Sequence, residues 1–99
     1  MRSVMREIRF FLDWGPKYPI WETGTDKYAM EPSDYGLTLE LDKALRSYVD
    51  FWNEHFIETD DSFEWDSSEN KKAFDAEGDR LIRWLQDEVK GIAHVRDER

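Results

Sequence analysis

The chain has 99 residues, a formal net charge of -9, 37% charged and 39% hydrophobic residues, and no cysteine. This length predicts one domain, residues 1–99, and the missing cysteine excludes disulfides, thiolate nucleophiles and cysteine-based zinc sites. No apolar run is long enough for a signal peptide or a membrane span, so we expect a cytoplasmic protein. The negative charge disfavours nucleic acids and anionic membranes as partners.

The first third of the chain is predicted to be a strand and loop region, residues 1–36. Residues 4–12 alternate between apolar and polar side chains, which is the pattern of a half-buried strand. Residues 18–21 form a short second extended piece, and Pro19 restricts it to the edge of a sheet. The Gly, Pro and Asp residues of 22–36 predict a loop.

A first amphipathic helix is predicted over about residues 38–57. Thr38 is a good N-cap, because its hydroxyl can accept a hydrogen bond from a backbone N–H of the first turn. Apolar residues then recur every three or four positions, from Leu41 to Phe56. This spacing gives the helix one buried face.

A second helix follows the acidic segment 58–66 and completes a helical hairpin over residues 37–91. Asp66 and Ser67 are equally good N-caps for it. Gly91 stands where a glycine ends a helix. Gly78 lies on the apolar stripe and costs about 1 kcal/mol against alanine, so we expect it to permit a close backbone approach to the sheet or the other helix.

The last segment, residues 92–99, reads as a closing strand and a polar tail, because Ile92–Val95 is short, apolar and follows a helix-ending glycine. The element order is therefore β-(β)-α-α-β. We predict an α+β fold in which a two-helix antiparallel hairpin packs on a small two- or three-stranded sheet. The terminal strands are expected to be adjacent.

Several short motifs extend along most of the chain. They are Pro19-Ile20-Trp21, Leu37-Thr38 with the central Trp52, the stretch Trp65-Asp66-Ser67-Ser68-Glu69, and Phe74 to Gly78 in the pattern F-x-x-E-G. This layout resembles a loose family of small bacterial proteins, many of them actinobacterial, with no assigned chemistry. The resemblance implies the same fold, and its motif residues are mainly caps, core tryptophans and a packing glycine.

The negative charge is concentrated in one part of the chain. Residues 37–70 hold ten of the 23 acidic residues and only two of the 14 basic ones. Within this part we predict an interaction surface of six carboxylates with two aromatic anchors. Its residues are Asp50, Glu54, Glu58, Asp60, Asp61, Phe63, Glu64 and Trp65. Aromatic residues ringed by like charges are typical of an interface with an oppositely charged protein.

Two other interpretations of the acidic residues remain open. Arg46, Lys71 and Lys72 could neutralise them within the chain, which would leave an ordinary solvated face. The spacing also fits the oxygen ligands of a helix–loop–helix calcium site, at Glu58, Asp60, Ser62, Glu64, Asp66 and Glu69. However, Phe63 occupies the position where the sharp turn of such a loop needs glycine, and we therefore assign no metal or cofactor.

His55 and His94 are the only histidines, and the sequence does not decide whether they meet. No nucleophile pattern, phosphate-binding loop or isolated carboxylate pair accompanies them, so we predict no enzymatic activity. The leading hypothesis is a protein-binding module that masks a basic partner by stoichiometric binding. An immunity- or antitoxin-like protein would be of this kind. The alternative is a structural adaptor whose aromatic surface forms a homodimer.

Overall fold

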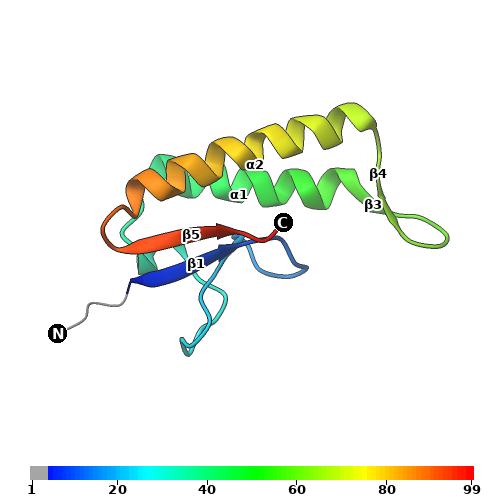
Figure 1. The fold of residues 1–99 in the computed structure, drawn as a ribbon. Coiled ribbons are helices and arrows are strands. Elements are labelled where there is room, and N and C mark those ends of the chain that lie inside the picture. Colours follow the sequence, from blue (N-terminus) through cyan, green and yellow to red (C-terminus); the bar gives the residue numbers. More distant parts are fainter. Residues whose placement is uncertain (1–4) are drawn as a thin grey trace.

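A computed structural model describes residues 5–99 and shows a mixed α+β fold in two layers. The elements are β1 (Arg6–Phe10), β2 (Ile20–Trp21), a 3-10 turn (Pro32–Asp34), α1 (Leu39–His55), β3 (Phe56–Glu58), β4 (Phe63–Trp65), α2 (Ser68–Glu88) and β5 (Ala93–Asp97). The two helices run antiparallel and lie on the same side of the sheet formed by β1, β2 and β5 (Figure 1). The predicted fold class and element order are confirmed.

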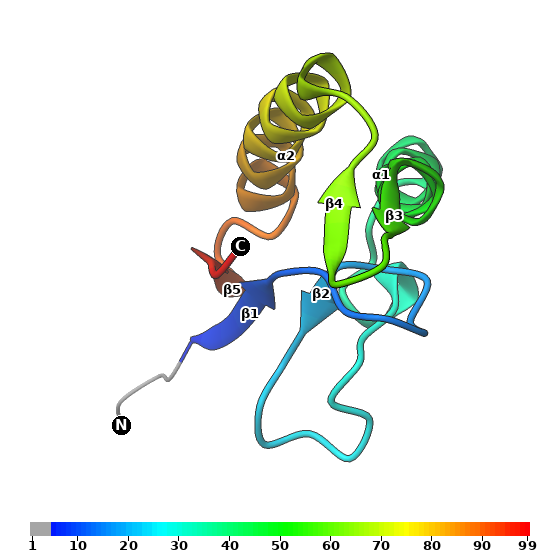
Figure 2. The ribbon, with the colours of Figure 1, turned by 90° about the vertical axis from the view of Figure 1, so that its right-hand side faces the viewer.

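The main sheet has the strand order β2-β1-β5. β1 pairs antiparallel with β2 and parallel with β5, so that Ile8 lies opposite Val95. Ile8 and Phe10 are fully buried beneath the helices, as the alternating pattern predicts. The first and last strands are thus neighbours, and an end-on view shows α2 above this strand pair (Figure 2).

Both helices begin at capping side chains that the sequence indicates. The Thr38 hydroxyl accepts a hydrogen bond from Leu41 N at 3.3 Å, and the Ser67 hydroxyl accepts one from Asn70 N at 3.0 Å. Ser67, and not Asp66, is therefore the N-cap of α2. In the described residues, no helix is both long and apolar enough to cross a membrane.

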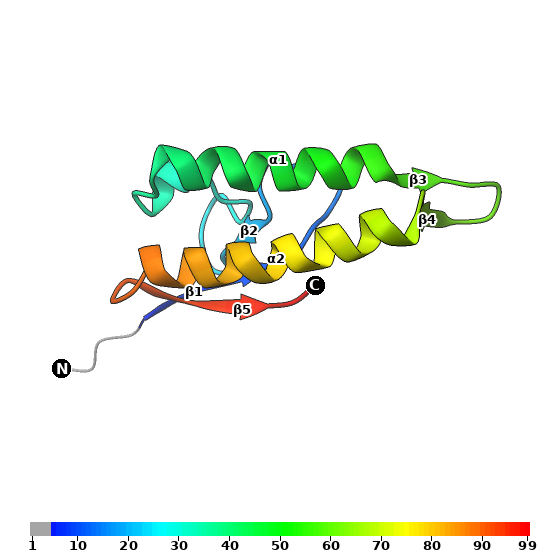
Figure 3. The same ribbon diagram turned by 90° about the horizontal axis from the view of Figure 1, so that it is seen from above.

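The segment 58–66, expected to be a plain connection, contributes to a second, two-stranded sheet. Phe56 pairs with Trp65, and Glu58 with Phe63, in an antiparallel β-hairpin. Alternating aromatic and β-branched side chains favour strands, and this preference ends α1 two residues before its expected end. Seen from above, the β3–β4 hairpin projects beyond the ends of the helices (Figure 3).

Gly78 permits the close approach expected of it. A Cβ atom at this position would lie 2.6 Å from the hydroxyl of Tyr48 on α1 and in contact with the guanidinium of Arg99, which follows β5. Three separate parts of the chain therefore meet at the middle of α2. The Tyr48 ring itself is stacked on Phe74, with ring centroids 4.1 Å apart.

The loop 22–36 is anchored by a buried carboxylate that sequence analysis did not single out. Glu22 is 8% exposed and accepts hydrogen bonds from Arg6 on β1, the shortest at 2.7 Å. The Tyr35 hydroxyl donates a further bond to it at 2.7 Å. The Arg6 hydrogen bonds lower the pKa of Glu22, so the carboxylate stays charged in the fold.

Candidate interaction surface

The predicted interaction residues lie at one end of the molecule, on the last turns of α1 and on the β3–β4 hairpin. The carboxylate residues are all exposed, namely Asp50 and Glu54 on α1, Glu58 on β3, Asp60 and Asp61 in the connecting loop, and Glu64 on β4. Because the hairpin extends beyond the core, these charges face solvent rather than the rest of the protein. We call this set of six residues the acidic surface.

Most of the acidic surface has no charge partner among residues 5–99. Lys71 pairs with Asp75 at 2.8 Å, and neither Arg46 nor Lys72 forms an ion pair in this part of the chain. Within residues 5–99, the only basic side chain near a carboxylate of this surface is His55, whose Nε2 atom lies 3.9 Å from Glu54 Oε2. The described residues therefore show no ion pair of Arg46, Lys71 or Lys72 with the acidic surface.

The two predicted aromatic anchors have different surroundings. Phe63 is 45% exposed, whereas Trp65 is half-buried and packs on Phe74 with ring centroids 4.9 Å apart. Trp14, which sequence analysis did not select, is 47% exposed; its ring stacks on Trp52 at 4.1 Å and packs at a tilt against Phe63 at 5.0 Å. An exposed aromatic cluster, Trp14 with Phe63, thus lies beside the acidic surface.

A polar cluster at the base of the hairpin joins α1, β4 and α2. His55 Nδ1 lies 2.7 Å from Asp66 Oδ2, and Asn70 Nδ2 donates to Asp66 Oδ1 at 2.9 Å. The hydrogen bonds from Asn70 and His55 lower the pKa of Asp66. His94 lies on β5, which follows the opposite end of α2, so the two histidines do not form one site.

The hairpin geometry also bears on the calcium interpretation. Glu58 and Glu64 lie on paired antiparallel strands rather than on a loop that wraps around a central ion. In residues 5–99 no group of three or more histidine, aspartate or glutamate side chains could hold a metal ion. The calcium hypothesis therefore has no geometric support in the described residues.

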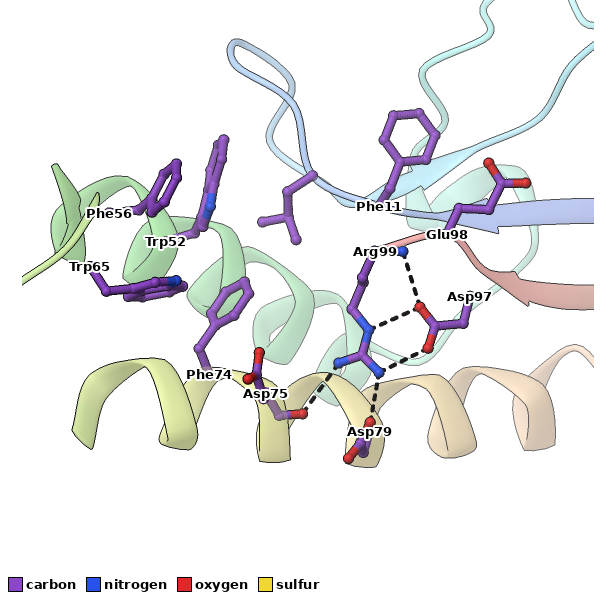
Figure 4. Close-up of a pocket in the computed structure, with 11 residues that line it drawn as sticks. Phe11, Trp52, Phe56, Trp65, Phe74, Asp75, Asp79, Asp97, Glu98 and Arg99 are labelled. Carbon is purple, nitrogen blue, oxygen red and sulfur yellow. Dashed lines mark hydrogen bonds and ion pairs between the residues drawn. The ribbon is translucent and has the colours of Figure 1, made fainter. Parts of the chain in front are cut away.

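A cleft of about 700 Å³ opens beneath the part of the helical hairpin that overhangs the sheet. One wall is aromatic and consists of Trp52, Phe56, Trp65 and Phe74. The opposite side holds Arg99 among acidic side chains of α2 and the end of β5 (Figure 4). The cleft is open to solvent and adjoins the exposed aromatic cluster through Trp52.

Arg99 is held by a set of acceptors on that polar side. Its Nε and Nη2 atoms donate to Asp97 at 2.9 Å each, and Nη2 also donates to Asp79 at 2.6 Å. Nη1 donates to the backbone carbonyl of Asp75 at 3.2 Å. These contacts lower the pKa of Asp97 and raise that of Arg99. Sequence analysis treated residue 99 as part of a polar tail, because nothing local marks its long-range contacts.

The geometry defines a small α+β protein whose acidic surface lies at one exposed end of the molecule. Comparison with known protein families identifies the family of the chain. The chain belongs to the family described as Serratia CdiI immunity protein-like, which matches residues 6–96. No curated protein matches it in sequence.

Proposed function

We propose that this protein is an immunity protein that binds one toxin molecule and blocks it without catalysing a reaction. Its membership of an immunity protein-like family over residues 6–96 supports this class of function. Its site of action in this proposal is the cytoplasm, where a toxin that attacks cellular targets has to be intercepted.

The observation that carries the proposal is the unpaired charge of the acidic surface. Asp50, Glu58, Asp60, Asp61 and Glu64 form no ion pair within residues 5–99. An exposed field of one sign raises the association rate with a partner of opposite sign. A toxin that acts on nucleic acid must be basic to hold phosphate, so the acidic surface is suited to masking such a partner.

The exposed aromatic cluster supplies the apolar part of this interface. Trp14 and Phe63 present nearly half of their surface to solvent beside the carboxylates. Aromatic residues dominate binding energy where they are covered, whereas surrounding charges mainly control rate and specificity. In this proposal the cluster determines how long the complex lasts, and the acidic surface determines how fast it forms.

The test is to purify the protein with the toxin domain encoded beside its gene and to measure mass by light scattering and association by stopped flow. We expect a one-to-one complex whose association rate falls as salt screens the acidic surface. A salt-insensitive homodimer that ignores the toxin would contradict the proposal and favour the adaptor hypothesis.

A charge-reversal variant makes the test specific to the surface. Glu58→Lys with Asp61→Lys should slow association about tenfold or more, because both charges lie in the steering field. The matched control is Asp26→Lys with Asp87→Lys, which changes the net charge equally at exposed positions outside the hairpin. If both pairs slow association to the same extent, the effect is one of net charge and the surface assignment fails.

A further inference from the structure

The cleft beneath the helical hairpin combines two features that no intrachain contact fully uses. Its aromatic wall includes Trp52 and Trp65, which are half-buried and keep part of their surface toward the cleft beside the buried Phe74. Its polar side already holds a guanidinium, that of Arg99. The two features are next to each other in one cavity of about 700 Å³ (Figure 4).

The side chains around the Arg99 guanidinium carry more negative charge than this one cation neutralises. Of the acidic residues that line the cleft, Asp75 is paired with Lys71 and Glu98 with Arg9, whereas Asp79 and Asp97 have Arg99 as their charge partner within residues 5–99. Asp79 and Asp97 share one guanidinium, so one negative charge of this pair is not compensated by it. The Arg99 side chain is 22% exposed, and its position can therefore be reached from solvent.

An independent observation comes from Tyr48. Its hydroxyl is buried and has no hydrogen-bond partner among residues 5–99. The hydroxyl lies close to the Arg99 guanidinium, since both groups would contact a Cβ atom placed on Gly78. A buried hydroxyl without a well-aligned partner is costly, and this one lies against the guanidinium of Arg99.

We propose that this cleft binds an arginine side chain of a partner protein, together with an apolar residue beside it, and that Arg99 occupies the guanidinium position in the free protein. The proposal rests on the function proposed above and names the feature of the partner that the cleft recognises. The incoming guanidinium takes over the carboxylates of Asp79 and Asp97 as Arg99 leaves. The neighbouring apolar residue packs on the aromatic wall.

This exchange explains why the two features occur together. Replacing one guanidinium by another leaves the number of charge-assisted hydrogen bonds nearly unchanged, so it contributes selectivity for arginine but little affinity. The affinity then comes from covering the aromatic wall, which Arg99 leaves open. A lysine fits less well, because an ammonium cannot form the paired hydrogen bonds that Asp97 makes with the Nε and Nη2 atoms of Arg99.

The probe for the test is the dipeptide acetyl-leucyl-arginine amide, titrated into the purified protein while the tryptophan indole N–H resonances are followed by NMR. Trp52 and Trp65 report on the cleft, and Trp84, whose indole donates to Glu88 at 2.7 Å, is the internal control. We expect saturable shifts of the two cleft resonances and none at Trp84. The neutral isostere acetyl-leucyl-citrulline amide should cause clearly smaller shifts, because only its leucine can pack on the aromatic wall.

Variants then separate the exchange from simple binding. Arg99→Ala should bind the arginine probe at least about tenfold more tightly, because the internal competitor is gone. In the Arg99→Ala background, Asp79→Asn, at an exposed side chain, should weaken binding, whereas Asp87→Asn on the same helix should not. Circular dichroism establishes that each variant is folded, and the comparison of the arginine and citrulline probes on the wild type decides the question if Arg99→Ala does not fold.

Equal shifts with the arginine and citrulline probes, or no shift at Trp52 and Trp65, would show that Arg99 is only a structural clamp and overturn the inference. Because the probe experiment contains no toxin, its failure leaves the proposed function standing. Conversely, failure to form a toxin complex leaves the result of the probe experiment unchanged. The two proposals can therefore fail separately.

Discussion

Thr38, the N-cap of α1, is bound at both its backbone N–H and its hydroxyl by the carboxylate of Glu88, the last residue of α2. The two hydrogen bonds measure 2.8 and 2.6 Å. Glu88 also accepts a bond from the Trp84 indole at 2.7 Å. One side chain therefore joins the start of the first helix to the end of the second, at the end of the hairpin opposite the acidic surface.

Replacing Glu88 by alanine should lower the free energy of unfolding by about 1–3 kcal/mol, because three hydrogen bonds to one carboxylate are lost at a partly exposed site. Urea denaturation measures the change. Asp87→Ala is the control, since its neighbouring side chain is exposed and should alter stability by less than about 0.5 kcal/mol. Equal effects of the two substitutions would show that the link to Thr38 contributes nothing.

The Arg6–Glu22 pair predicts a pH dependence of stability. The pKa of Glu22 is lowered from its ordinary value of 4.5, chiefly by the hydrogen bonds from Arg6. A carboxyl with a lowered pKa in the fold stabilises the protein above its ordinary pKa, and this contribution is lost as the pH falls through the lowered value. The unfolding free energy should therefore decrease below about pH 4.5.

Glu22→Gln tests this assignment, because it keeps the size of the side chain and removes its titration. The variant should be less stable than the wild type at neutral pH by about 1–3 kcal/mol, and its unfolding free energy should change less between pH 5 and 3. Urea denaturation across this range gives both quantities. Parallel pH profiles for the two proteins would assign the acid sensitivity to other carboxyls.

The contact at Gly78 predicts coupled effects of substitution. Gly78→Ala should destabilise the protein by about 1–3 kcal/mol, because the new Cβ would lie 2.6 Å from the Tyr48 hydroxyl and would touch Arg99. Tyr48→Phe alone should be neutral or stabilising by up to about 1 kcal/mol, since it removes an unpartnered buried hydroxyl. The double variant should lose less than Gly78→Ala does in the wild type, which thermal unfolding measures.

The Tyr48→Phe variant also connects stability with the cleft. In the Arg99→Ala background it should bind the arginine probe more weakly, because the hydroxyl faces the guanidinium position, while Tyr48→Phe alone should be at least as stable as the wild type. A variant with unchanged probe affinity would remove Tyr48 from the proposed recognition of arginine. NMR titration in the Arg99→Ala background and thermal unfolding of Tyr48→Phe alone give the two values.

The polar cluster of His55, Asp66 and Asn70 should control local opening of the β3–β4 hairpin. Asp66→Ala removes the shared acceptor, so amide hydrogen exchange at residues 63–65 should accelerate. The global unfolding free energy should change by less than about 1 kcal/mol, because Asp66 is exposed. Asp61→Ala, in the connecting loop, is the control and should leave the exchange rates unchanged.

The parts of the fold that depend on local patterns could be predicted from the sequence. Thr38 and Ser67 cap helices because a short hydroxyl before an amphipathic segment has one main structural use. Gly78 could be recognised as a packing position because glycine inside a helix is unfavourable unless something must come close. The buried alternation of β1 follows from period two alone.

What could not be predicted depends on contacts between distant residues. Glu22 and Arg99 lie in segments of loop or tail composition, and they are held by partners far along the chain: Arg6 is 16 positions from Glu22, and Asp79 and Asp75 are 20 and 24 positions from Arg99. Trp14 precedes a Gly-Pro turn, and only the folded chain shows that it stacks on Trp52. The β3–β4 hairpin was missed because its strands have three residues each, too few to show a period beside a strongly periodic helix.

Because β1 pairs with β5, the main sheet cannot be completed until β5 has been synthesised. Arg9 on β1 bonds Glu98, 89 positions later, at 2.8 Å. At a translation rate of about 5–20 residues per second, β1 waits several seconds on the ribosome for this neighbour. In that interval the β1–β2 pair can form, but Ile8 and Phe10 lack the cover of α2 and β5. During that interval the apolar face of β1 stays exposed, and the core around it closes only once α2 and β5 have been synthesised.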